Sequence, residues 1–427
     1  MENSLLLRGA SLAGLAGLLF LAWLLSENRR RAQWRVVAWG IGLQFVLGVL
    51  VLRTEFGRAF FAAVKGAFDL ITSASAAGAE FLFGNLTRLF VLDRAMVLGP
   101  DGTMAPQEPF VVGAVMGFNV LPVIIFVAGL SAILQHFGVV QAVVRAMAWL
   151  MRRTLKTSGA ETFGAALLVF TGIESAATLG DYVRRMTRSE LFTIQTAYLA
   201  TIAASVMVAY ASFGAEPGHL MAASLMSAPA AIALAKIMVP ETGVPETSSE
   251  GHRFEMTVDS VNLFDAAARG AGVGLNMALN VGALLIVFVG LIHLADQASL
   301  AVTGAKLNVL LGYGFRPFAL MMGVPWRDIG PVSELLATKT VFNEFMAYQN
   351  LQGMILGEVI SKRSIVIATY ALCGFANPGS LGILIGGLSS LAPERRAEVA
   401  RMSLRALAAG TFAAFMTACV AGVLLQE

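Results

Sequence analysis

Residues 169–180 read VFTGIESAATLG and place a glutamate, Glu174, in the middle of a stretch otherwise suited to lipid. A carboxylate is costly inside a bilayer, so ionisable groups at that depth usually face a binding site or a transport pathway. The apolar part, about 163–179, is short for a membrane span and is interrupted at Thr171–Gly172. Basic residues lie on both sides of it: Arg152, Arg153 and Lys156 before, and Arg184, Arg185 and Arg188 after. We therefore expect a re-entrant helical hairpin that enters and leaves on the cytoplasmic face.

The whole chain has the composition of a membrane protein. Of its 427 residues, 57% are hydrophobic and only 13% are charged, which is more apolar surface than a soluble domain hides from water. Runs of roughly 20 apolar residues, enough to cross a hydrocarbon core of about 30 Å, recur along the chain. The first run, 5–25, is followed by arginines and not by a small-residue cleavage site, so we interpret it as a retained helix. The composition predicts an all-α polytopic membrane protein.

Residues typical of other chemistries show no useful pattern. The two cysteines, Cys373 and Cys419, lie in apolar stretches, and the four histidines lack metal-ligand spacing. The sequence contains no phosphate-binding glycine loop, and its basic residues are not interleaved with aromatic ones. We expect no cofactor, no metal centre and no nucleic-acid partner.

Arginines indicate the orientation, because Lys and Arg concentrate on cytoplasmic flanks. Arg29, Arg30, Arg31 and Arg35 put the first loop inside and the N-terminus outside, and the arginines of 391–405 put the C-terminus outside as well. Further spans are expected at 36–52, 108–134, 191–213, 219–238, 270–294, 364–388 and 404–425. Two helices are expected at the membrane surface: 55–90, and the amphipathic 139–156, for which a peripheral core helix is the alternative.

A polar linker at 240–262 divides the chain into two halves of similar organisation. The second half has its own interrupted apolar stretch, 333–348, which contains Glu344. The distribution of basic residues predicts that one interrupted segment opens to the cytoplasm and the other to the outside. Such pairs are typical of inverted repeats with a binding site near the membrane midplane.

Polar residues in these interrupted segments are the candidate site. Glu174 and Glu344 are expected to face a ligand, although a carboxylate that caps a hairpin tip is the alternative. The stretch LCGFANPGSLG, 372–382, adds Phe375, Asn377 and Ser380 beside a Pro-Gly interruption. An amide, a hydroxyl and an aromatic face suit a ligand that joins a polyol to a planar ring, whereas helix packing or a kink is the simpler explanation of each residue alone.

Several motifs in order along nearly the whole chain resemble the concentrative nucleoside transporter family. They include Leu25-Ser26-Glu27-Asn28-Arg29, Leu121-Pro122-Val123-Ile124-Ile125-Phe126, Thr157-Ser158-Gly159-Ala160-Glu161, Asn343-Glu344-Phe345 and Gly374-Phe375-Ala376-Asn377. The resemblance implies a homotrimer whose protomers have eight transmembrane helices and two opposed re-entrant hairpins. It also implies a mobile transport domain within a trimeric scaffold. The implied division is as follows: scaffold helices in 1–135; interfacial helix, first hairpin and half of the transport domain in 136–240; linker and scaffold helix in 241–295; second hairpin and the other half of the transport domain in 296–427.

The resemblance carries site roles over residue by residue. Glu344, Asn377 and Ser380 match the family's ligands of the ribose hydroxyls, and Phe375 matches a residue that lines the base. The first hairpin departs from the family's Gly-Gln-Thr-Glu-Ala-Pro, because this chain has Thr171-Gly172-Ile173-Glu174-Ser175-Ala176. Glu174 is kept, but Gly172 and Ile173 replace the amide and hydroxyl that read the base, so base specificity does not carry over.

The coupling cation follows from a second departure. Sodium-coupled members have an asparagine seven residues before the hairpin glutamate, and Leu167 stands there in this chain without an oxygen for a hard cation. The carbonyl groups of Phe170 and Ile202 and the hydroxyl of Thr201 remain usable. We expect proton coupling with Glu344, or else Glu174, as the carrier, because a carboxylate removed from water is a workable proton binder.

The sequence thus predicts a proton-coupled secondary active symporter that imports nucleosides across the inner membrane, with both termini periplasmic. The alternatives are sodium coupling and a divergent family member that carries another ribosylated or planar solute. A membrane nucleoside sensor without transport activity is a further alternative. An enzyme with Glu174 and Glu344 as an acid and base pair would need a nucleophile or metal ligands that the sequence does not offer.

Overall fold

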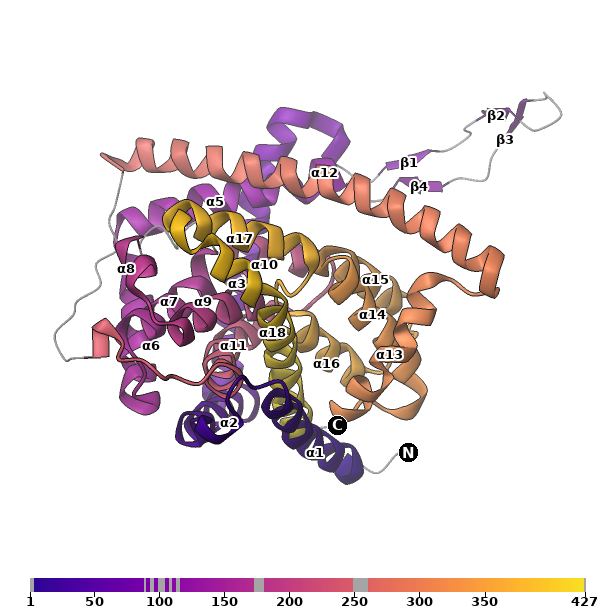
Figure 1. The fold of residues 1–427 in the computed structure, drawn as a ribbon. Helices are drawn as coiled ribbons and strands as arrows, with labels where there is room; N and C mark the ends of the chain where they lie inside the picture. Colours follow the sequence, from indigo (N-terminus) through magenta and orange to yellow (C-terminus); the bar gives the residue numbers. More distant parts are fainter. Residues whose placement is uncertain are drawn as a thin grey trace.

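The computed structural model describes residues 4–87, 90–92, 96–98, 104–106, 110–112, 116–172, 180–248 and 260–425. Within these residues, eight helical stretches are long and apolar enough to cross a membrane. This number equals the number of spans that the family resemblance implies. Figure 1 shows the helices packed into one body, with both termini at the same end.

The part before the first hairpin is built of helices: α1 (Ser4–Leu24), α2 (Trp34–Arg53), α3 (Glu55–Phe83), α4 (Met116–Asn119), α5 (Leu121–His136) and α6 (Val139–Leu155). The stretch 55–90, expected to lie on the membrane surface, forms α3, which is long and apolar enough to be one of the eight spans. The amphipathic 139–156 forms α6 as predicted, with the basic Arg152 and Arg153 in its last turn.

Short strands interrupt this helical part: β1 (Phe90–Leu92), β2 (Met96–Leu98), β3 (Met104–Pro106) and β4 (Phe110–Val112). β1 pairs antiparallel with β4, and β2 pairs antiparallel with β3. The four strands stand off the helical body in Figure 1. The expected span from 108 therefore starts later, at α4 and α5.

The first half continues with α7 (Gly159–Thr171), α8 (Gly180–Arg185), α9 (Arg188–Ala200), α10 (Ala204–Ser212) and α11 (Pro217–Met238). α7 begins with a capping box in which Ser158 and Glu161 satisfy each other's backbone amides. It ends at Gly172, whose φ of 73° and ψ of −173° suit only glycine. The predicted interruption at Thr171–Gly172 is thus the end of a helix. Residues 173–179, which include Ile173 and Glu174, lie outside the described residues.

The second half is α12 (Leu263–Thr303), α13 (Leu307–Met321), α14 (Ile329–Val341), α15 (Glu344–Leu356), α16 (Lys362–Leu372), α17 (Pro378–Leu391) and α18 (Arg396–Leu424). α14 and α15 form a helical hairpin with its tip at Phe342–Asn343. α12 crosses one side of the body in Figure 1. It packs closely on α5, where a Cβ on Gly274 would lie 2.8 Å from Ile125 Cα. Short 3-10 turns occupy Arg29–Arg31, Gly84–Thr87, Glu246–Ser248, Trp326–Asp328 and Pro393–Arg395.

Two expected spans are each divided into two helices. The span predicted at 191–213 unwinds at 201–203 between α9 and α10, and the one at 364–388 unwinds at 373–377 between α16 and α17. The two breaks meet, because the Phe375 amide donates to the Thr201 carbonyl at 3.2 Å. Gly374 allows this approach, since a Cβ there would lie 3.0 Å from the Leu199 carbonyl oxygen. The unwound backbone of each half is therefore covered by protein, as the membrane interior requires.

Candidate functional site

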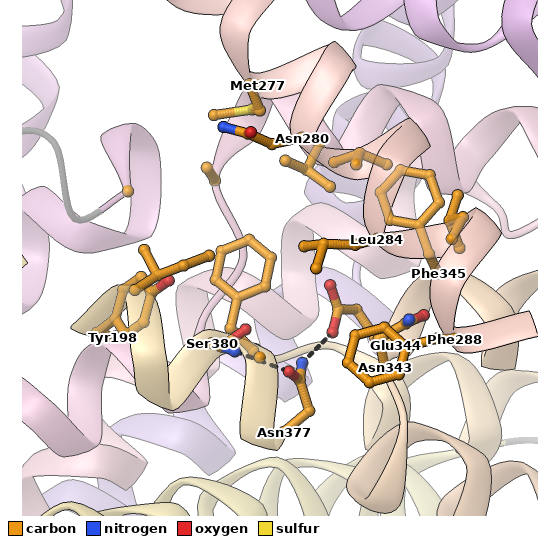
Figure 2. A pocket seen from close by; sticks show the side chains of 18 of the residues that line it. Tyr198, Met277, Asn280, Leu284, Phe288, Asn343, Glu344, Phe345, Asn377 and Ser380 are labelled. Carbon is orange, nitrogen blue, oxygen red and sulfur yellow. Dashed lines mark hydrogen bonds between the residues drawn. The ribbon is translucent and has the colours of Figure 1, made fainter. Parts of the chain in front are cut away.

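A cavity of about 360 Å³ lies where the two breaks, the tip of the second hairpin and α12 come together. Its walls combine a polar set with a larger apolar set (Figure 2). The lining residues include Gly172, Tyr198, Met277, Asn280, Leu284, Phe288, Asn343, Glu344, Phe375, Asn377 and Ser380. The cavity thus draws on both halves of the chain.

Two helices begin at the cavity, and each is capped by an asparagine. Asn343 caps α15 by accepting from the Met346 amide at 2.9 Å, and Asn377 caps α17 by accepting from the Ser380 amide at 2.9 Å. Asparagine is among the best N-cap residues. Helix N-termini carry partial positive charge, so the two caps aim a favourable field at an anion in the cavity.

Glu344, the first residue of α15, is that anion. Its side chain is buried, with 6% of its surface exposed. The Asn377 amide nitrogen donates to Oε2 at 2.6 Å, and the Tyr210 hydroxyl donates to Oε1 at 2.8 Å. A carboxylate offers about four lone-pair positions, so these two hydrogen bonds do not exhaust its capacity to accept.

Asn377 acts in two directions at once. Its oxygen caps α17 while its nitrogen binds Glu344, as the dashed lines in Figure 2 show. This fixes the amide orientation and places Ser380, one turn further on, at the cavity wall with 7% of its surface exposed. Carboxylate, amide and hydroxyl therefore converge on one small volume.

Aromatic and apolar side chains form the other walls. Phe375 packs against Tyr198 with ring centroids 5.7 Å apart and an interplanar angle of 40°. Met277, Leu284 and Phe288 of α12 also line the cavity (Figure 2). A planar ring fits between such surfaces, where aromatic faces stack well.

The first hairpin contributes Gly172 to the cavity wall. Glycine has no side chain, so this position offers no side-chain hydrogen bond to a ligand. Its backbone conformation also disfavours the glutamine that the family has there. The other two candidates on this hairpin, Ile173 and Glu174, cannot be placed because they lie outside the described residues.

Two of the predicted cation ligands, Thr201 and Ile202, lie in the first break, and the third, Phe170, lies on α7. The Thr201 hydroxyl donates to the Ala197 carbonyl at 2.8 Å, and its own carbonyl accepts from Phe375. Ile202 is buried and Phe170 is partly buried. Leu167 is fully buried and presents only hydrocarbon.

Several polar residues in or near the cavity were not predicted as site residues, among them Asn276 and Asn280 of α12, Asn343, Tyr210 and Lys339. Asn343 and Tyr210 gave no spacing signal, because one residue at a helix cap and one tyrosine in an apolar span are common. Lys339 could have been found as a second charge in the apolar stretch around Glu344. It is fully buried, donates to the Ala371 carbonyl at 3.3 Å, and lies 5.8 Å from the Phe415 ring. Its ammonium group therefore stabilises the carbonyl end of α16.

The chain is similar to known proteins both in sequence and in fold. Three family models match the chain: Na+ dependent nucleoside transporter N-terminus at 13–86, a gate model described as nucleoside recognition at 117–217, and Na+ dependent nucleoside transporter C-terminus at 219–422. Together they cover most of the chain, including the second hairpin and both breaks.

Similar proteins occur in animals and bacteria. Solute carrier family 28 member 3 of Mus musculus is 40% identical over 97% of this chain and 58% of its own length. Sodium/nucleoside cotransporter 1 of Rattus norvegicus is 37% identical over 97% of this chain and 63% of its own length. The chain therefore spans less than two thirds of these animal relatives. The uncharacterized transporter YutK of Bacillus subtilis (strain 168) is 36% identical over 97% of this chain and 98% of its own length.

The fold is also that of a solved transporter. The structure of CNTnw in an inward-facing substrate-bound state matches with a TM-score of 0.87 and 36% identity, and covers 97% of this chain and 98% of that one. The family consists of transporters and not of enzymes, in agreement with the sequence prediction. The chain belongs to the concentrative nucleoside transporter family.

Proposed function

We propose that this protein imports nucleosides across the inner membrane by alternating access, driven by a proton gradient. The observation that carries the proposal is the convergence of Glu344, Asn377 and Ser380 beside Phe375 in one cavity. A ribose offers two neighbouring hydroxyl groups and a nucleobase offers a planar ring, which are the two surfaces that this cavity complements.

Ribose recognition follows from the free lone pairs of Glu344. Hydroxyl groups that donate to a carboxylate form charge-assisted hydrogen bonds, which are about twice as strong as neutral ones. A ligand without those hydroxyls leaves a buried carboxylate poorly satisfied, and sites built in this way reject such ligands strongly. Base recognition rests on stacking against Phe375, so we expect both purine and pyrimidine nucleosides to compete.

Proton coupling is supported by the side chain of Leu167, which offers no oxygen to sodium. The carrier is then Glu344, with Glu174 as the second candidate. A hydroxyl can both donate and accept, so Tyr210 can accept a hydrogen bond from Glu344 when the carboxyl group carries a proton.

Sodium coupling is the second candidate, and the names of two kinds of relatives favour it. The family models are described as Na+ dependent, and one relative is called a sodium/nucleoside cotransporter. In that case the hydroxyl of Thr201 and the carbonyl oxygens of Phe170 and Ile202 would supply ligands without Leu167.

Assembly and topology complete the proposal. We assign 1–135 and 241–295 to a scaffold, and 136–240 and 296–427 to a moving transport domain, within a homotrimer. The cavity supports this division, because α12 forms one wall while the breaks and the second hairpin form the others. Both termini would face the periplasm. The Arg8 guanidinium donates to the Leu425 carbonyl at 2.7 Å, which supports a common side for the two ends.

The test is uptake of radiolabelled uridine and adenosine into proteoliposomes, with a proton gradient and a sodium gradient imposed separately. Uptake with the proton gradient alone is expected. Uptake with the sodium gradient alone would overturn proton coupling and leave nucleoside transport intact. No uptake of either nucleoside under either gradient would overturn the proposed substrate.

A further inference from the structure

Tyr210 is a buried residue to which the proposed function assigns no role in sugar recognition. It lies on α10, in the first half of the chain, whereas Glu344 lies on the second hairpin. Its hydroxyl donates to Glu344 Oε1 at 2.8 Å, and the tyrosine itself has no exposed surface. Tyr210 is not among the residues that line the cavity, so it contacts Glu344 from behind.

Aromatic packing holds the Tyr210 ring in place. It stacks on Tyr348 with centroids 4.5 Å apart and an interplanar angle of 17°. It also meets Phe345 edge-to-face at 5.0 Å and 73°. Both arrangements are favourable for aromatic pairs. Because the ring cannot shift without disturbing both partners, the direction of its hydroxyl is fixed.

The two oxygens of Glu344 are therefore held from two different elements. Tyr210 of α10 holds Oε1, and Asn377 of the second break holds Oε2. Two donors at separate oxygens define the plane of the carboxylate as well as its position. The remaining lone pairs then have fixed directions, which is what selective binding of two adjacent hydroxyls requires.

We propose that Tyr210 is a positioning residue for ribose recognition: its hydroxyl orients Glu344 so that the site distinguishes a ribose from sugars lacking one hydroxyl. This inference rests on the proposed nucleoside function and adds a determinant of sugar specificity. Tyr210 acts through Glu344 and does not touch the nucleoside.

The chain offers a matched control in Tyr348. It stacks on Tyr210, is equally buried, and donates its hydroxyl to the Thr369 carbonyl at 2.9 Å. Tyr210→Phe and Tyr348→Phe each remove one oxygen from neighbouring rings. Only the first removes a donor from Glu344.

The experiment measures binding of uridine, 2′-deoxyuridine and 3′-deoxyuridine to purified full-length protein in detergent. We expect Tyr210→Phe to weaken uridine binding about tenfold, as loss of one hydrogen bond to a charged group does. We expect the deoxyuridines to be affected less, so that the preference for uridine shrinks. Tyr348→Phe should leave that preference unchanged. An unchanged preference in Tyr210→Phe, or an equal loss in both variants, would overturn the inference.

A second measurement separates positioning from folding. In the Glu344→Gln background, Tyr210→Phe should cause no further loss of uridine binding, because the two residues act as one unit. An additive loss would mean that Tyr210 acts on its own and would overturn the inference. If Tyr210→Phe does not fold, site-specific 3-fluorotyrosine at 210 and at 348 replaces the two phenylalanine variants. It keeps each hydroxyl but changes its strength as a donor, so only the change at 210 should alter uridine binding, and no change there would contradict the proposal.

The outcomes also separate this inference from the function on which it rests. Failure of the unmodified protein to bind any of the three compounds would overturn nucleoside recognition and the role of Tyr210 together. Binding by the unmodified protein with indistinguishable tyrosine variants would overturn the role of Tyr210 alone.

Discussion

Among the described residues, the two hairpins carry their buried charges at opposite ends. In the first hairpin, the polar groups gather at the foot of α7, where Ser158 and Glu161 form a capping box and Lys236 pairs with Glu161 at 2.6 Å. The rest of α7 up to Val169 is buried and mostly apolar. In the second hairpin, Lys339 and Glu344 lie at the tip beside the cavity. In the described part of the first hairpin the charges are thus paired at the foot, whereas in the second hairpin Glu344 lines the cavity and Lys339 is buried close to it.

Two buried lysines differ in the same way. Lys236 donates to Ser189 Oγ at 2.9 Å and pairs with Glu161 and Glu241. Lys339 donates to a backbone carbonyl and forms no ion pair among the described residues. It lies in the last turn of α14, and Glu344 begins α15 on the other side of the hairpin tip. We therefore expect Lys236, which has close carboxylate partners, to contribute mainly to stability. We expect Lys339, which has none among the described residues, to affect mainly the site around Glu344.

The largest effect should come from Glu344→Gln, which removes the anion at the tip of the second hairpin. Two charge-assisted hydrogen bonds to a ribose would be lost or weakened, so we expect the KM for uridine to rise at least about 100-fold. Proteoliposome uptake over a range of uridine concentrations measures this.

Glu334→Gln is the control for this change, because Glu334 lies on α14 of the same hairpin and contacts Asn308 at 3.4 Å, away from the cavity. It should retain uptake. Equal losses in both variants would mean that Glu344 has no special role and that the contrast between the hairpins is wrong.

The next effect separates the two lysines. Lys236→Met leaves Glu161 buried without its cation, and breaking a buried pair in this way costs about 3–5 kcal/mol of folding free energy. Lys339→Met should lower the melting temperature less but reduce uridine uptake about tenfold, because the lost charge lies near the site. Thermal unfolding in detergent and uptake are measured on both variants.

A rescue sharpens this test. Glu161→Gln combined with Lys236→Met should recover part of the stability, because it removes the uncompensated carboxylate as well. If Lys339→Met proves less stable than Lys236→Met, then the second hairpin also depends on its lysine for folding, and the two lysines do not differ as described.

Much of this arrangement could be predicted from the sequence. Glu344, Asn377 and Ser380 stood out because polar side chains are rare in apolar stretches, and the motifs around them matched a family. The break at 201–203 was harder to predict than the one at 373–377, which lies beside the predicted Pro-Gly interruption. The first has no proline or glycine within it, and its unwinding is compensated by the Phe375 amide from the other half. Such a contact between distant segments leaves no local signal.

Tyr210 shows the same limit for side chains. Nothing in the sequence around it distinguishes it from a tyrosine that only fills space. Its hydroxyl gains a role because α10 packs against the second hairpin, 134 positions away in the chain. Residues that face the cavity can be recognised in the sequence by their polarity. The role of a residue that acts through another one depends on tertiary packing and cannot be recognised in that way.

An effect of similar size on uptake is expected from the first hairpin. Leu167→Asn restores an amide oxygen at the position where sodium-coupled members have one, so a sodium gradient should then raise uridine uptake about tenfold. Leu168→Asn is the control, because Leu168 is equally buried but points in another direction on the same helix. If neither variant responds to sodium, the side chain at position 167 does not determine how uptake depends on this cation.

The smallest effect concerns charges outside the membrane. Glu27 lies in the loop after α1, and both of its oxygens accept from Arg188 of α9, at 2.7 and 3.1 Å, while Arg405 of α18 pairs with it too. The hydrogen bonds from Arg188, partly offset by burial and reinforced by Arg405, hold the pKa of the Glu27 carboxyl below its ordinary value of 4.5. Glu27→Gln should therefore cost at most about 1 kcal/mol, since solvent screens such pairs.

The pH dependence of that difference identifies its source. A group with a lowered pKa in the folded state contributes its full stability above the unfolded pKa, and the contribution is lost as pH falls through the folded pKa. The melting temperature of the unmodified protein should thus exceed that of Glu27→Gln at pH 7, and the gap should close as the pH is lowered below about 4.5. Glu55→Gln, which breaks an exposed pair with Arg58 on α3, should show almost no gap at either pH. A gap for Glu27→Gln that persists unchanged in acid would mean that the shape of the side chain, and not its charge, stabilises the loop. The charges at this face would then contribute less to stability than those at the foot of the first hairpin.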